Sequence, residues 1–312
     1  MPFNRATLEA AIAASDGAEQ SSAQVGGLLA KLQALDAVGC YGQLLKAIAR
    51  ANDKNNFLAL VLEATFAHQF EAQGISLDYE VKQEPASGSS IDFGMRLDEG
   101  QAAYFELRLL QQDRAIAQSI EQQLEKTGAY AVALGGGDEQ RAVLKVQSTV
   151  LSKVEDKDGR PVKFLKVDDG ALNIVVVCIS DIMGGTADLY DCILATYGDP
   201  EVPAICRRQV FGLFQDVQPD YPEHVQKAAA RFAHIKATLH GVLFLFREKE
   251  AGPLDYPLEQ VLVWNRALTS KETTRVASER IYAAIPPLKR AAASSSAAPV
   301  MRPGPSLRHQ AS

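Results

Sequence analysis

Acidic residues within apolar segments constrain this chain more than any other feature of its sequence. Glu63 lies in a helical pattern, Asp92 in a short strand-like run, and Glu106 in the next such run, two residues before Arg108. An isolated buried carboxylate is unfavourable unless it is paired, protonated or bound to a cation. Three of them in successive elements, followed by a fixed positive charge, indicate a functional site within the core.

The first acid belongs to a predicted buried helix over residues 56–71. Apolar residues cover nearly its whole circumference, which is typical of a helix inside a domain. The same-face neighbours of Glu63, at three, four and seven residues, are Ala59, Leu60, Phe66, Ala67 and Phe70. We therefore expect Glu63 to point inward.

The other two acids lie in predicted strands at 89–95 and 103–110. Turn signals at Ser87-Gly88 and at residues 98–100 bound these runs, which predicts a hairpin. Because side chains alternate across a strand, Glu106 and Arg108 share one face. Asp92 on the adjacent strand then has room beside them.

Each residue also has a purely structural interpretation. Glu63 fits a buried acid paired with a basic residue such as Lys54 or an arginine of the sheet. Asp92 follows a Ser-Gly loop and fits a residue that accepts hydrogen bonds from backbone amides. Glu106 and Arg108 fit a solvated strand face.

Taken together, these residues resemble the PD-(D/E)xK phosphodiesterase superfamily of restriction endonucleases and DNA-repair nucleases. Its core has a helix glutamate, a strand, an aspartate on a second strand, and Glu-x-Lys on a third. Glu63, Asp92 and Glu106-Leu107-Arg108 match this order within about residues 52–180. Ile91 replaces the proline of the family's name, and Arg108 replaces its lysine.

The resemblance implies a restriction-endonuclease-like fold and hydrolysis of DNA or RNA. Glu63, Asp92 and Glu106 would bind Mg²⁺ or Mn²⁺, with Asp92, Glu106 and Arg108 as the catalytic residues. Mg²⁺ prefers hard oxygen ligands, and a bound metal ion activates water and neutralises charge at phosphorus. Arginine stays charged, so Arg108 would clamp a phosphate but would not act as a general base. This departure leaves open an alternative, a catalytically inactive nuclease-like domain that binds a protein partner.

The pattern of elements predicts an α/β protein with a central mixed sheet flanked by helices. We expect a helical region at 1–51 packed on the core, with breaks at 15–17 and at Gly26-Gly27, then the nuclease-like domain at 52–285. Further strands are expected near 77–83, 172–180, 241–247 and 260–266, with helices at 116–124, 143–154 and between 223 and 239. The Ala/Ser/Pro-rich, basic segment 286–312 is typical of a disordered tail.

Composition excludes several functional classes. The 312 residues are 47% hydrophobic and 22% charged, which fits a folded chain, and no apolar run is long enough to cross a bilayer. The N-terminus lacks the layout of a signal peptide, so we expect a cytoplasmic protein. The cysteines, histidines and glycines form no zinc or nucleotide motif.

The net charge of −6 argues against a broad basic surface that coats nucleic acid. A local basic groove remains compatible with this charge. Its candidates are Arg141, Lys145, Lys153, Lys157, Arg160, Lys163 and Lys166, although a solvated helix face and loop explain them equally well.

Overall fold

The structure is a computed structural model of the whole chain. It describes residues 3–15, 21–82, 90–97, 100–110, 136–155, 164, 170–179, 188–198, 211–247 and 254–286. The helix predicted at 116–124, four of the candidate basic residues (157, 160, 163 and 166) and nearly all of the predicted tail lie outside these ranges. Side chains of residues 136–142 and of residues 224 and 228 are likewise not described.

Six strands form one mixed sheet in the order β1-β2-β3-β4-β5-β6. Their bounds are β1 Leu77–Val81, β2 Ile91–Arg96, β3 Ala102–Leu109, β4 Ala171–Cys178, β5 Gly241–Arg247 and β6 Leu258–Trp264. The first three strands are antiparallel neighbours, β3, β4 and β5 run parallel, and β6 returns antiparallel to β5. The expected hairpin is present, with Gly100 at a φ of +80° in its turn.

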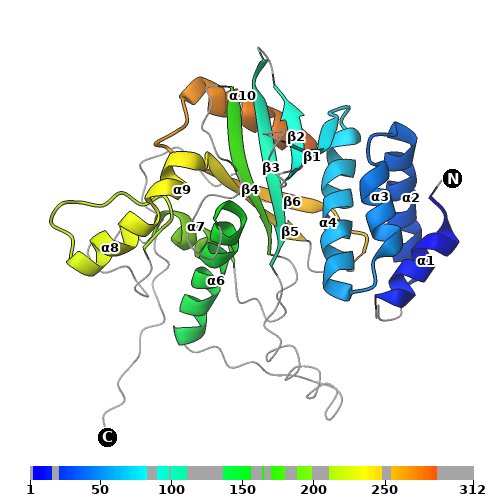
Figure 1. Cartoon of the computed structure of the whole chain (residues 1–312), viewed down its shortest axis with the longest axis horizontal. Coiled ribbons are helices and arrows are strands. Elements are labelled where there is room, and N and C mark those ends of the chain that lie inside the picture. The colour runs from blue at the N-terminus through cyan, green and yellow to red at the C-terminus, as the bar shows by residue number, and fades with distance from the viewer. Residues whose placement is uncertain are drawn as a thin grey trace, which may run out of the picture.

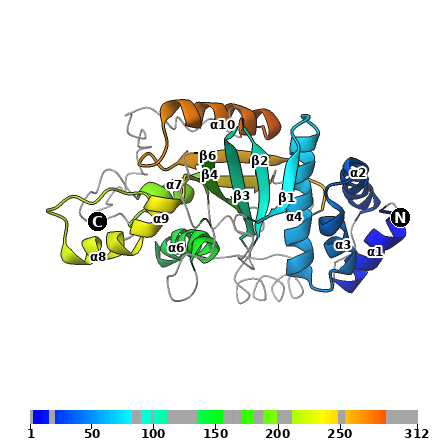
Figure 2. The ribbon, with the colours of Figure 1, turned by 45° about the horizontal axis from the view of Figure 1, so that its top comes forward.

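Helices cover both faces of this sheet. Their bounds are α1 Arg5–Ala14, α2 Ser22–Val38, α3 Gly42–Arg50, α4 Lys54–Glu71, α6 Gly136–Val154, α7 Leu189–Tyr197, α8 Glu223–Arg231, α9 Ala233–Thr238 and α10 Lys271–Ala284. Figure 1 shows α4 between the sheet and the N-terminal helices, and Figure 2 shows α10 and α6 on opposite sides of the sheet. The prediction of an α/β protein with a mixed sheet flanked by helices is confirmed.

Two apolar cores lie on the two faces. One unites α1–α4 and α10 with side chains such as Phe93, Phe105 and Leu107. The other unites α6–α9 with Val175, Val177 and their neighbours. Since the N-terminal helices and the sheet share the first core, residues 5–50 pack on the α/β region through α4.

The sequence of α4 explains its length and its burial. The Asp53 side chain accepts a hydrogen bond from the N–H of Asn56 and so caps the first turn. Beyond the last turn, Gly74 has a φ of +72°, and the N–H of Ile75 donates to the carbonyl of Phe70. Phe57, Leu60, Val61, Leu62, Ala64, Thr65, Phe66, Ala67 and Phe70 are buried, as the all-round apolar pattern predicts.

The break predicted at Gly26-Gly27 is wrong, because α2 runs through both glycines. A Cβ at Gly27 would lie 1.7 Å from Oδ2 of Asp255, whereas a Cβ at Gly26 would meet nothing within 4 Å. Gly27 is therefore needed for close packing against the segment before β6. Lys31, one turn further along α2, holds Asp255 in place through an ion pair of 2.7 Å.

Candidate functional site

A side-chain hydrogen bond of Asp92 continues the contact between β2 and β3 where their backbone pairing ends. The last residue pair of the two strands is Phe93 with Phe105, and Asp92 lies directly beyond it. There Oδ2 of Asp92 accepts a hydrogen bond from the N–H of Leu107 at 2.6 Å. A carboxylate thus takes the place of a backbone carbonyl between the two strands. The structural interpretation of Asp92 as a partner of a backbone amide holds in part, although the amide belongs to the neighbouring strand and not to the loop.

Glu106 is a fully buried acid with a cation from another element. Its side chain is 0% exposed, and its Oε1 lies 2.6 Å from Nζ of Lys153, whose side chain is 19% exposed. Lys153 lies in the last turn of α6, which returns over this face between the parallel strands β3 and β4. Because the sequence separation is 47 residues, the crossover topology is what brings the pair together.

Glu63 reaches the same region from α4, on the other face of the sheet. Its Oε2 accepts a hydrogen bond from the hydroxyl of Tyr79 on β1 at 3.1 Å. Although the residue keeps some exposure, burial of its carboxylate is the largest cause that raises its pKa from 4.5 to about 8. The negative charge of Asp92 and, more weakly, that of Glu106 raise the pKa further, while the Tyr79 hydroxyl and the charge of Lys153 oppose the shift.

The electrostatic effects on Glu63 show which predicted residues come together. Asp92 and Glu106 both act on Glu63, so the helix acid and the two strand acids share one electrostatic environment. Arg108 is on the same strand face as Glu106 by alternation, but its side chain is exposed while that of Glu106 is buried. The suggested partner of Glu63, Lys54, lies nine residues away along α4, and Tyr79 makes the observed hydrogen bond.

Sequence reasoning missed two residues of this site. Lys153 was one of seven basic candidates for a nucleic-acid surface, and nothing in its local sequence links it to Glu106. Tyr79 received no role, although its place in an alternating strand that follows the Glu63 helix puts it on the α4 face. Burial and Glu63 together raise the pKa of Tyr79 well above its usual value, so its hydroxyl remains the proton donor.

The arrangement concentrates three carboxylates and one ammonium group where the strands β2 and β3 part. Asp92 and Glu106 each have a partner in the present arrangement, Leu107 and Lys153. Within the ranges that the structure describes, no three His, Cys, Asp or Glu side chains are already spaced to hold a metal ion. Ion binding would require Asp92 or Glu106 to turn from its partner.

Two other findings limit the interpretation of the molecule. The electrostatic neighbours of His68 on α4 are Lys31 and Asp255. In the described part of the chain, no helix has the length and apolar character of a membrane span.

Comparisons with known proteins identify no relative from which a function could be assigned. No family model matches the chain, and neither a curated protein nor a solved structure matches it.

Proposed function

We propose that this protein is a metal-dependent nuclease that hydrolyses phosphodiester bonds in DNA or RNA. The observation that carries the proposal is the ion pair between Lys153 and Glu106 beside Asp92 and Glu63. The expected nuclease pattern needs a cation near its last acid, and the strand offers only the exposed Arg108. Lys153 supplies a compact ammonium group at that acid from α6.

The order and pairing of the elements support the restriction-endonuclease-like assignment. A helix acid is followed by a strand, by an aspartate on a second strand and by a glutamate on a third. These three strands are neighbours in the sheet, and the third continues in parallel to β4 through α6. The same order defines the family resemblance in the sequence.

The donor chemistry at this site suits Mg²⁺ or Mn²⁺. All three candidate ligands are carboxylates, the hard oxygen donors that Mg²⁺ prefers. Burial is the largest cause of the raised pKa of Glu63, and Asp92 and Glu106 add negative charge that a divalent cation would neutralise. When bound, the ion would lower the pKa of a water molecule and offset charge at the phosphodiester.

The chain's own residues then have distinct tasks. Asp92, Glu106 and Glu63 would hold the ion in the gap where β2 and β3 part, with Glu63 approaching it from the α4 face and Glu106 from the α6 face. Lys153, released from Glu106, would hold the attacking water or a phosphate oxygen by its ammonium group. Arg108 would contact a phosphate further out, because it is exposed on the same strand face as Glu106.

One observation favours the alternative, an inactive nuclease-like domain that binds a protein partner. Asp92 and Glu106 are already engaged by Leu107 and Lys153, as expected for acids with structural partners. In that case Lys153 is a permanent counter-ion of a buried carboxylate and not a reacting group.

Nuclease assays with charge variants separate the two functions. Wild type should cleave single- or double-stranded nucleic acid with Mg²⁺ or Mn²⁺ and stop with chelator. Lys153→Met should abolish cleavage, whereas the matched change Arg108→Met should weaken it less. Since Lys153→Met leaves a buried charge and costs about 3–5 kcal/mol of stability, the charge-preserving variant Lys153→Arg serves as the folded comparison.

The outcomes are distinct. Lys153→Arg should keep the fold and part of the activity, because it retains the charge. If folded wild-type protein cleaves no nucleic acid with either ion, the nuclease proposal is wrong and the protein-binding domain takes its place. Cleavage that survives Lys153→Met unchanged would remove Lys153 from the reaction.

A further inference from the structure

We propose that Tyr79 is a positioning residue, whose hydroxyl fixes the Glu63 carboxylate for a divalent cation. The proposal rests on the proposed function of the same site. Tyr79 donates to Oε2 of Glu63 at 3.1 Å. It comes from β1, so it adds a fourth element to a site whose acids come from α4, β2 and β3.

The ring of Tyr79 has a fixed place in an aromatic layer. Its centroid lies 5.3 Å from that of Phe93, with an angle of 52° between the planes. Phe93 in turn lies 5.6 Å from Phe66, which belongs to the same helix as Glu63. The donor and its acceptor are therefore held by one packed cluster, and a tyrosine hydroxyl has little freedom once its ring is fixed.

This constraint is useful because a glutamate side chain is flexible. Ordering a free glutamate costs up to about 1.5–2 kcal/mol of side-chain entropy. A hydrogen bond that orders Glu63 before the ion arrives removes part of that penalty from binding. Ligand carboxylates in metal sites are typically held by such outer partners.

The backbone of β1 is also unusual beside Tyr79. Glu80 has a φ of +51°, in the left-handed region that non-glycine residues rarely adopt. The register passes from the Tyr79–Phe93 pair to the Val81–Ile91 pair around it, level with Asp92. Such strain persists where the surrounding structure holds the chain firmly, often at functional sites.

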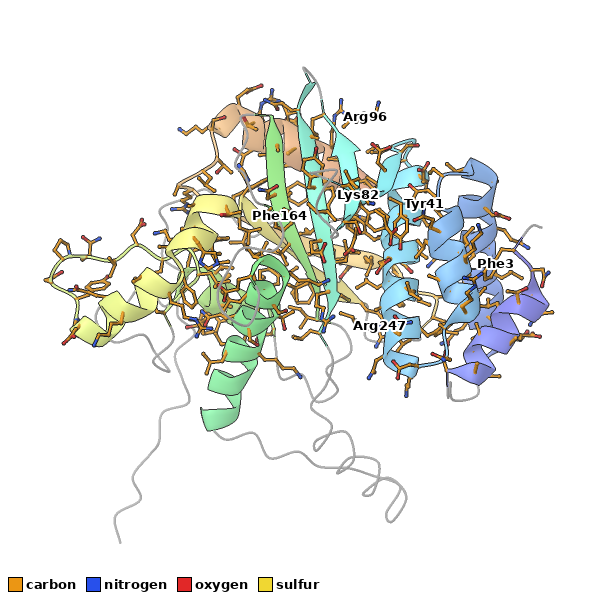
Figure 3. The ribbon with its side chains drawn as sticks, viewed as in Figure 1. Phe3, Tyr41, Lys82, Arg96, Phe164 and Arg247 are labelled. Atoms are coloured by element: carbon orange, nitrogen blue, oxygen red, sulfur yellow. The ribbon has the colours of Figure 1, made fainter. Side chains whose placement is uncertain are left out.

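A second tyrosine provides a matched control. The hydroxyl of Tyr41 donates to Oε1 of Glu71, also on α4, at 2.6 Å. Tyr41 lies at the start of α3 beside α4 (Figure 3), and Glu71 is eight residues from Glu63. Tyr41→Phe thus removes the same type of bond from the same helix, away from the three acids. It also removes the acceptor of the Leu77 N–H on β1, so it is the more disruptive of the two changes.

Titration of Mn²⁺ into folded protein, followed by calorimetry, tests the proposal without an activity assay. Tyr79→Phe should weaken Mn²⁺ binding by roughly tenfold to a hundredfold. Tyr41→Phe should leave Mn²⁺ affinity unchanged even if it lowers the melting temperature. In a Glu63→Gln background, Tyr79→Phe should have no further effect, because the carboxylate that it positions is gone.

Three results would overturn the proposal, and they differ in whether they also contradict the proposed nuclease function. Equal Mn²⁺ affinity in wild type and Tyr79→Phe leaves the nuclease intact and makes Tyr79 structural. An equal loss in Tyr41→Phe assigns the effect to general destabilisation. A wild-type protein that binds no Mn²⁺ removes both the positioning role and the proposed function.

Discussion

Glu63→Gln should abolish an unusual dependence of stability on pH. The pKa of Glu63 in the folded protein is about 8 against an ordinary value of 4.5. Between these two values the folded chain holds a proton that the unfolded chain has lost, so this residue destabilises the fold as pH rises. The direction is opposite to that of a carboxylate in a favourable ion pair.

The size of the effect follows from the two pKa values. Between pH 5 and pH 7 the wild type should lose up to about 2.5 kcal/mol of unfolding free energy through this group, since one pKa unit corresponds to about 1.4 kcal/mol. Most of the loss should be complete near pH 8, where Glu63 is fully ionised in the unfolded chain and about half ionised in the folded protein. Glutamine resembles the protonated acid and cannot ionise, so the variant should escape the loss.

Urea unfolding in chelator at pH 5, 6, 7 and 8 measures the difference between the two proteins. We expect Glu63→Gln to match wild type at pH 5 and to become steadily more stable relative to it up to pH 8. Saturating Mg²⁺ should stabilise wild type at pH 8 and so narrow the gap. A difference that stays constant across this range would show that burial and the neighbouring acids do not act on Glu63 as described.

Two further predictions concern neighbouring contacts. In chelator, Asp92→Asn should raise the free energy of unfolding by about 1 kcal/mol or less, and with it the melting temperature, because it removes repulsion with Glu63 while its amide oxygen still accepts from Leu107. Asp92→Leu leaves that buried N–H without its acceptor and should lower the free energy of unfolding by about 1–3 kcal/mol. An equal loss in both variants would mean that the charge of Asp92 itself is needed for stability. Gly26→Ala should stabilise α2 by up to about 1 kcal/mol, since a Cβ there meets nothing, whereas Gly27→Ala should destabilise the protein by about 1–3 kcal/mol because it pushes Asp255 off Lys31. Thermal unfolding of the pair tests this, and a stabilised Gly27→Ala would show that Asp255 yields at little cost.

The strands were predictable from sequence because their signal is local. The run at 172–180 is apolar from 174 to 179, as expected for a strand covered on both faces, and β4 occupies Ala171–Cys178. The hairpin of β2 and β3 follows from two short apolar runs around a glycine turn. The helix break predicted at the two adjacent glycines of α2 was wrong because a glycine indicates either a break or a close approach of another segment. Only the position of Asp255 shows that Gly27 is a site of close approach.

The partners of the acids were not predictable because they depend on the crossing of distant elements. Alternation in β3 places Glu106 and Arg108 on one face, but it does not say which of them is covered. The parallel pairing of β3 with β4 requires the intervening chain to return over the sheet, and α6 makes this return antiparallel to β3. The last turn of α6 therefore covers the middle of β3, where it buries Glu106 and brings Lys153 to it.

This topology also means that Glu106 does not depend on Arg108 for its counter-charge. A cation on β3 two residues after Glu106 lies nearer the carboxyl end of the strand, where the side chain of Arg108 is exposed. A buried carboxylate needs its counter-charge inside the core, and α6 already provides one there. Residue 108 is then free to change without unfolding the site, so Arg108→Lys should have little effect on stability, whereas removing the charge of Lys153 leaves Glu106 uncompensated in the same protein.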